Sequence, residues 1–211
     1  MPDPVLASEK KAMTPDLNRD SARRQAAASI DALQRAASRL LDETFDELWR
    51  GFEMLRATFE RGNHLHVCGN GGSAADAQHF VTEMVVRLDA HSRRRALPAT
   101  ALSTDTSILT AAANDYGFEQ VFARQIEARA NSGDLVLLIS TSGNSPNMLA
   151  AAAAARKRLA GTLALIGKDG GHLKPLVDCA VVAPSDSTQR IQEIHTLCLH
   201  LWCEWLDPVF S

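Results

Sequence analysis

The sequence is poor in aromatic residues and has no excess of positive charge. Only 5% of its 211 residues are aromatic, whereas alanine is abundant, and the formal net charge is −3 at neutral pH. Few aromatic residues and many alanines favour a helix-rich α/β protein over an all-β sandwich. Because no basic field covers the chain, we expect no nucleic-acid partner.

Three further absences restrict the class of protein. None of the four cysteines is spaced from another as C-x-x-C, which argues against a zinc site built from cysteines. The N-terminus lacks the apolar segment of a secretory signal, and the longest alanine-rich stretch, residues 149–155, is too short to span a bilayer. We therefore expect a cytoplasmic protein with reduced thiols and no membrane partner.

Length and pattern predict one domain behind a polar tail. Residues 1–18 are polar and contain three prolines, so we expect a mobile tail there, and we expect one domain over residues 19–211. Apolar residues recur at helical spacing from Asp20 to about Arg61, with a break expected near residues 42–44. An apolar stripe of this length ahead of the first strand suggests packing against another subunit.

The rest of the chain alternates strand-like and helix-like segments. Strands are expected at residues 64–68, 99–103, 135–140, 162–166 and 179–182. Helices are expected at residues 73–87, 106–113, 118–130, 145–159 and 188–206. This alternation predicts a parallel sheet with helices on both faces, in which ligands bind beyond the carboxyl ends of the strands.

Two polar loops fall at those carboxyl ends. The segments Cys68–Ser73 (CGNGGS) and Ser140–Ser145 (STSGNS) each follow a predicted strand and open a predicted helix. Amides at a helix N-terminus favour an anion, glycines allow close approach, and the hydroxyls add donors. These features predict phosphate binding, although the serines at 73 and 145 could also be simple helix caps. Neither loop contains a lysine, which argues against a Walker-type nucleotide site.

Several polar side chains on two predicted helices could carry chemistry. Asp76, His79 and Glu83 share one face of the helix after the first loop. The His79–Glu83 pair can bind a metal or hold a base beside an imidazole, but alone it is more often a surface ion pair. Gln192 and His200 are eight residues apart, about 12 Å along a helix, so spacing alone does not establish a shared metal.

Three other polar groups allow a plain structural interpretation. His195, among apolar residues of the last helix, is interpreted as a hydrogen-bonded core or surface histidine. The run Arg93–Arg95 is interpreted as a solvated loop, with contact to an anionic substrate as the alternative. Asp115 lies in an Asn-Asp-Tyr-Gly turn near the expected ligand edge, so it is either a turn residue or part of the site.

Five motifs, in this order, carry a resemblance to a known family: CGNGGSAADAQHF, TDTSILTAAANDYGFE, ISTSGNSPN, GKDGG and RIQEIHTLCLH. With them the chain resembles, from about Ala26 to Leu206, the bacterial phosphoheptose isomerases, which are sugar isomerase (SIS) domain proteins. The resemblance implies a flavodoxin-like five-stranded parallel sheet flanked by helices, with an N-terminal helical extension. It also implies a homotetramer with active sites at subunit interfaces and one zinc ion per subunit.

The resemblance further implies a reaction and its residues. The reaction is aldose–ketose isomerisation of sedoheptulose 7-phosphate to D-glycero-D-manno-heptose 7-phosphate through an enediol, for lipopolysaccharide-core or related heptose. Glu83 is implied as the catalytic base and His200 as its partner acid/base. The implied zinc ligands are His79, Glu83, Gln192 and His200. The implied substrate contacts are Asn70, Gly71, Gly72, Ser73, Arg87, Asp115, Ser140, Thr141, Ser142, Ser145 and Gln192.

Two features of the chain limit how far the residue roles of the family apply to it. Val85 and Val86 stand where relatives often carry small or polar residues, so the pocket wall beside Arg87 is expected to differ. A carboxylate bound directly to zinc is a weaker base. Glu83 therefore either alternates between binding the metal and accepting the proton, or the metal is mainly structural.

Other SIS proteins share the glycine and serine loops. One alternative is a non-catalytic regulator that binds the replication-initiation protein, and such regulators look to lack the acid/base pair that Glu83 and His200 provide. A second alternative is an isomerase of another sugar phosphate, against which the QEIH…H helix argues. A third is a sugar-phosphate-sensing transcription regulator, for which no helix-turn-helix segment is evident.

Overall fold

A five-stranded parallel sheet lies at the centre of the molecule. The computed structural model describes residues 17–211, and its strands lie in the order β2-β1-β3-β4-β5. This order is the flavodoxin-like one, so the predicted fold class is confirmed. The strands are β1 (Leu65–Gly69), β2 (Ala99–Ala101), β3 (Leu135–Ser140), β4 (Gly161–Gly167) and β5 (Cys179–Ala183).

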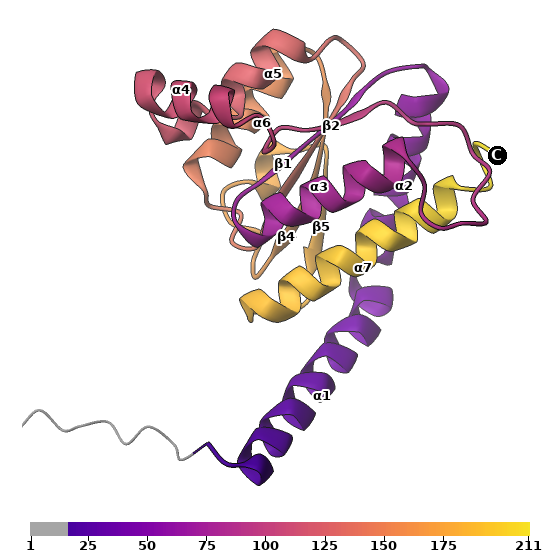
Figure 1. Ribbon diagram of the computed structural model, residues 1–211, viewed down its shortest axis with the longest axis vertical. Helices are drawn as coiled ribbons and strands as arrows, with labels where there is room; N and C mark the ends of the chain where they lie inside the picture. The colour runs from indigo at the N-terminus through magenta and orange to yellow at the C-terminus, as the bar shows by residue number, and fades with distance from the viewer. Residues whose placement is uncertain (1–16) are drawn as a thin grey trace, which may run out of the picture.

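Helices cover both faces of this sheet. Figure 1 shows α4, α5 and α6 on one side and α2, α3 and α7 on the other. Successive strand residues point into opposite cores, so Leu163 and Leu165 contact one helical layer and Ala164 and Ile166 the other. The helices are α1 (Arg19–Glu43), α2 (Phe45–Glu60), α3 (Gly72–Val85), α4 (Thr106–Tyr116), α5 (Ala123–Arg129), α6 (Pro146–Lys157) and α7 (Thr188–Leu206).

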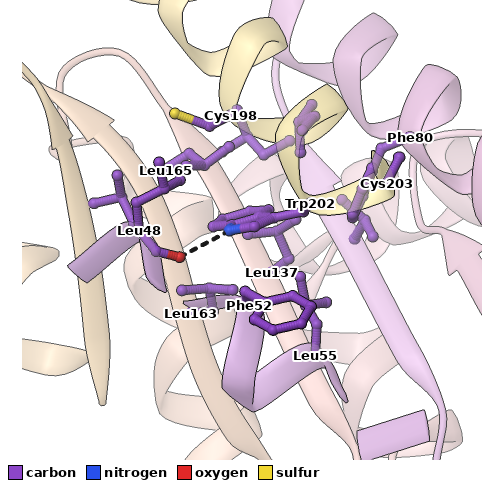
Figure 2. Packing of buried hydrophobic residues seen from close by; sticks show 14 of the residues in the cluster. Leu48, Phe52, Leu55, Phe80, Leu137, Leu163, Leu165, Cys198, Trp202 and Cys203 are labelled. Carbon is purple, nitrogen blue, oxygen red and sulfur yellow. Dashed lines mark hydrogen bonds between the residues drawn. The ribbon is translucent and has the colours of Figure 1, made fainter. Parts of the chain in front are cut away.

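Trp202 of α7 anchors the layer that holds α3 and α7 in place. Its ring is fully buried, and its indole Nε1 donates a hydrogen bond to the Leu48 carbonyl of α2 at 2.9 Å (Figure 2). Gly51 leaves room for the ring, because a Cβ there would lie 2.6 Å from Trp202 Cζ2. This packing fixes how α7 lies against α2 and the sheet.

Helix α1 extends away from the α/β body (Figure 1). It begins in a capping box formed by Asn18 and Ser21, and only Ala36 and Leu40 of its residues are buried. The helix ends before Thr44, within the range predicted for a break between two helices, and the chain continues directly as α2. Most of the α1 surface is therefore left without a partner inside the described chain.

Two predictions for segment boundaries need correction or lie outside the described residues. The helix expected over residues 118–130 is split into a 3₁₀ turn, Phe118–Gln120, and α5, because Val121 and Phe122 between them turn into the core. Of the predicted mobile tail, residues 1–16 lie outside the described part, and Asn18 caps α1. Within residues 17–211, no helix has the length and apolar character needed to cross a membrane.

Candidate active site

The two predicted ligand loops meet where the strand order reverses. Strands β1 and β3 are neighbours, with Val67 opposite Leu137, so the loops after them open side by side. Asn70 after β1 and Asn147 at the start of α6 exchange two side-chain hydrogen bonds, of 2.9 and 2.8 Å. This reciprocal amide pair ties the two loops together at the carboxyl edge of the sheet. Asn147 was not identified from the sequence, where its amide looked like any residue of a helix's first turn.

The second loop is held in shape by its own hydroxyls. Ser140 is buried, and its Oγ accepts the Gly143 amide at 3.2 Å, while Ser142 Oγ accepts the Asn144 amide at 3.2 Å. Gly143 has φ +63°, and a Cβ there would collide with the Gly170 carbonyl of the loop after β4. The loop is therefore a tight, packed turn rather than a free segment.

Simple capping does not explain the serines of these loops. Helix α3 has Gly71 at its N-cap, so Ser73 lies inside the first turn, where it is buried. Ser145 occupies the N-cap of α6, but its side chain makes no capping hydrogen bond. A cleft of about 490 Å³ opens beside Asn70, Ser145 and the 3₁₀ turn at Phe118. Ser145 thus lines a cleft that a ligand can reach.

A second group of polar side chains lies between α3 and α7. His79 Nε2 is 2.8 Å from His200 Nε2, and these nitrogens lie 3.2 and 3.5 Å from Glu83 Oε1. The three ligand atoms lie within 4.8 Å of one another. The side chains of His79 and His200 are 48% and 39% exposed, whereas the Glu83 side chain is only 11% exposed. A solvent-facing cluster of two imidazoles on a semi-buried carboxylate results.

The other oxygen of Glu83 has a partner that sequence reasoning missed. Cys203 of α7 donates its thiol hydrogen to Glu83 Oε2, with a sulfur–oxygen distance of 2.9 Å. Burial, reinforced by the adjacent Glu83 carboxylate, raises the pKa of this thiol well above its usual range. A cysteine in an apolar stretch of helix looks like a core residue, so only its i+3 spacing from His200 could have drawn attention.

Asp76 lies one helical turn before His79, at the same contact between α3 and α7. Its Oδ1 accepts a hydrogen bond from Thr196 at 3.3 Å, and its Oδ2 is buried without a partner among the described residues. Burial raises the pKa of Asp76, partly offset by the Thr196 bond. The predicted shared face of Asp76, His79 and Glu83 is therefore the face that α3 presents to α7.

Other predicted site residues lie elsewhere. The Gln192 carboxamide packs against the backbone of Gly72, seven residues before His79 and so about 10 Å from it along α3. Asp115 is exposed, accepts a bond from Asn114 at 2.8 Å, and lines a groove between α4 and α5. Arg87 is exposed beyond the end of α3. The roles assigned to these three residues stay predictions.

The interpretation of the arginine run as a solvated loop is wrong for Arg94. Its guanidinium is fully buried and donates to the carbonyls of Glu83 and Met84 at the end of α3, and it pairs with Asp207 at 3.3 Å. A cation at a helix C-terminus satisfies carbonyls that have no partner within the helix. Arg94 therefore anchors α3 to the end of α7.

His195 is a core histidine, as interpreted from the sequence. It is fully buried, and its Nε2 lies 3.0 Å from the Ile166 carbonyl of β4. Burial lowers the pKa of His195 to about 4, so the ring is neutral near pH 7. It lies outside the His79–Glu83–His200 cluster.

Comparison with known proteins agrees with the fold. The profile of the SIS domain family matches residues 30–167. A phosphoheptose isomerase of Citrifermentans bemidjiense is 55% identical over 149 residues, 71% of this chain and 77% of its own. One from Helicobacter pylori strain P12 is 47% identical over 180 residues, 85% of this chain and 93% of its own. The solved structure of a phosphoheptose isomerase from Neisseria gonorrhoeae superposes with a TM-score of 0.83 at 38% identity, covering 88% of this chain and 98% of that one.

Proposed function

The chain belongs to the SIS domain family, among its phosphoheptose isomerases, and we propose that Glu83 and His200 carry the proton transfers of that reaction. The enzyme is an aldose–ketose isomerase that converts sedoheptulose 7-phosphate to D-glycero-D-manno-heptose 7-phosphate for heptose biosynthesis. The observation that carries the assignment of residues is the convergence of His79, Glu83 and His200 on one point between α3 and α7.

The reaction needs one group to move a proton between carbons and another to move one between oxygens. Glu83 takes a proton from C1 of the ketose, leaving an enediol, and returns it to C2. His200 accepts the proton of the C1 hydroxyl and delivers one to the C2 oxygen, so the aldose forms with no net gain or loss of protons. Histidine suits this role because its ordinary pKa is near neutrality.

The phosphate of the substrate binds, in this proposal, to the two loops at the carboxyl edge. Support comes from the hydroxyl-rich turn that opens α6 and from the Asn70–Asn147 pair that fixes its position against the first loop. Donors at a helix N-terminus suit a phosphate. The residues proposed to bind phosphate and sugar are Asn70, Gly71, Gly72, Ser73, Asp115, Ser140, Thr141, Ser142, Ser145, Gln192 and Arg87.

The His79–Glu83–His200 cluster also fits a zinc ion. Two imidazole nitrogens and one carboxylate oxygen converge from two helices, which is a donor set that zinc takes in enzymes. We propose one zinc per subunit, held by these three side chains; Gln192, implied as a fourth ligand, lies instead against Gly72, about 10 Å away along α3, so the described residues supply three ligands. When bound, the ion would stabilise negative charge on the substrate oxygens as a Lewis acid.

We further propose a homotetramer with its active sites at subunit interfaces. The exposed surface of α1 and the exposed side chains of Val85, Val86 and Leu197, at the end of α3 and on α7, support this assembly, because apolar groups there are not covered by any of residues 17–211. A cytoplasmic location is proposed as well, supported by four buried cysteines that are all free thiols. Nothing in the site favours a regulator over an enzyme, since the acid/base pair is complete.

Incubation of the purified protein with sedoheptulose 7-phosphate, with and without a chelator, tests the reaction and the metal together. Glu83→Gln should fold and bind the sugar phosphate but lose at least about 100-fold in kcat, because the amide cannot accept the proton. Glu60→Gln, which alters an exposed ion pair with Arg56, serves as the matched control. Wild-type turnover by Glu83→Gln would remove Glu83 from the mechanism.

A further inference from the structure

The two oxygens of Glu83 have different surroundings. Oε1 faces the imidazoles of His79 and His200 at the surface, while Oε2 points inward and meets the thiol of Cys203 at 2.9 Å. Cys203 is 1% exposed and follows His200 by three residues, so one face of α7 presents both side chains to α3. The carboxylate is therefore placed between a polar surface group and a buried donor.

We propose that Cys203 is a positioning residue, whose thiol fixes the Glu83 carboxylate so that Oε1 alone faces the reacting groups. This proposal rests on the proposed function, in which Glu83 is the base and a metal ligand. An ionised carboxylate can only accept hydrogen bonds, so the thiol is the donor in this contact. The role is an orienting one, because the sulfur touches Glu83 and not the imidazoles.

Without the thiol, Oε2 would lose the one hydrogen-bond donor that it has among the described residues. Cys203 belongs to the same buried cluster as Phe80 and Trp202, and Figure 2 shows it beside Phe80. A buried acceptor that loses its donor is destabilised, and more so when it is charged. The carboxylate then turns towards water or binds a stray water, and the direction of Oε1 is no longer fixed.

The backbone of Glu83 is held by a separate anchor. The Arg94 guanidinium donates to the carbonyls of Glu83 and Met84 and pairs with Asp207, just beyond α7. The end of α3 is thereby fixed to the end of α7, and the torsions of the Glu83 side chain remain the adjustable part. Cys203 contacts the side chain of Glu83 and not its backbone. Loss of the thiol should therefore change the site without unfolding α3.

Partners that orient a metal ligand typically contribute 10–100-fold to metal affinity or activity. For Cys203→Ala we expect a 10–100-fold weaker zinc affinity and a similar fall in kcat. The KM for the sugar phosphate should change less than about 3-fold, since the phosphate loops lie at the other end of α3. Cys203→Ser keeps a donor and should recover most of both properties.

The test compares Cys203→Ala, Cys203→Val and Cys203→Ser with Cys198→Ala. Cys198 is equally buried on the same helix and in the same cluster, on the other side of Trp202 in Figure 2. Zinc affinity is measured on metal-free protein by competition with a chromophoric chelator, alongside kcat and KM. Cys203→Val fills the space without a donor, so it tests the hydrogen bond if the alanine variant folds poorly.

The proposal holds if the alanine and valine variants lose zinc affinity and kcat while serine restores them and Cys198→Ala does not change them. It is overturned if Cys203→Ala binds zinc and turns over like Cys198→Ala, or if serine fails as alanine does. A wild type that binds zinc but does not isomerise sedoheptulose 7-phosphate would refute the proposed reaction. The zinc affinities would still decide the role of Cys203.

Discussion

The buried imidazole of His195 should make the protein less stable as the pH falls below neutrality. Its Nε2 bonds to the Ile166 carbonyl, and its Nδ1 has no partner among the described residues. Burial lowers the pKa of His195 from 6.5 to about 4. His195→Gln keeps a nitrogen donor for the same carbonyl but cannot take up a proton.

The sign and size of the effect follow from proton uptake. Between pH 6.5 and 4 the unfolded chain binds a proton at this histidine and the folded chain does not, so the free energy of unfolding falls as the pH falls. A difference of about 2.5 pKa units, at about 1.4 kcal/mol each, amounts to roughly 3.5 kcal/mol once the pH is below both pKa values. Above pH 7 both states are neutral at His195, and the contribution is constant.

Urea unfolding at a series of pH values between 7.5 and 4.5 measures this difference. Protein concentration is kept fixed, because subunit association would shift the apparent stability. The wild type should lose about 2–3 kcal/mol more than His195→Gln between these limits. His64 and His66, whose pKa values are also lowered by burial, are present in both proteins and cancel in the comparison. Parallel stability curves, or a wild type that gains stability towards acid, would refute the reasoning.

Two further predictions concern the phosphate loop and the core. The double variant Ser140→Ala/Ser142→Ala should raise the apparent KM for sedoheptulose 7-phosphate by about 10-fold or more with a smaller change in kcat, because charged ligands lose two donors; steady-state kinetics that show an unchanged KM would count against the loop as the phosphate site. Trp202→Phe should lower the free energy of unfolding by about 2 kcal/mol, through the lost bond to Leu48 and the cavity, and should weaken zinc binding while the KM for the sugar phosphate is retained; urea unfolding, chelator competition and steady-state kinetics measure these three quantities.

The helices and strands with a clear hydrophobic pattern were predictable from the sequence. The bounds expected for β3 and α7 agree with those observed, because an uninterrupted apolar run and a long helical periodicity each have one interpretation. The segment over residues 118–130 was not, because it begins with a 3₁₀ turn in which Phe118 is exposed, and the buried residues Val121 and Phe122 separate that turn from α5. Periodicity reports which face is buried but does not detect a change in helix type.

The run Arg93–Arg95 shows a second limit of prediction from a single sequence. Three consecutive arginines look like solvated charge, and nothing local distinguishes the middle one. Arg94 is buried because it lies where the last carbonyls of α3 and the Asp207 carboxylate need a donor, and those groups come together only in the folded chain. Such anchors depend on tertiary packing, which a single sequence does not report.

The two halves of the site depend on different features of the chain. The two loops proposed to bind phosphate are placed by topology, since two neighbouring parallel strands must end at the same edge, and the closeness of the loops was therefore predictable. The cluster of His79, Glu83 and His200 depends on how α7 is rotated against α3, and that rotation is set by Trp202, Gly51 and Arg94 far from the reacting atoms. Small changes in helix packing should accordingly alter proton transfer and zinc binding before they alter phosphate binding.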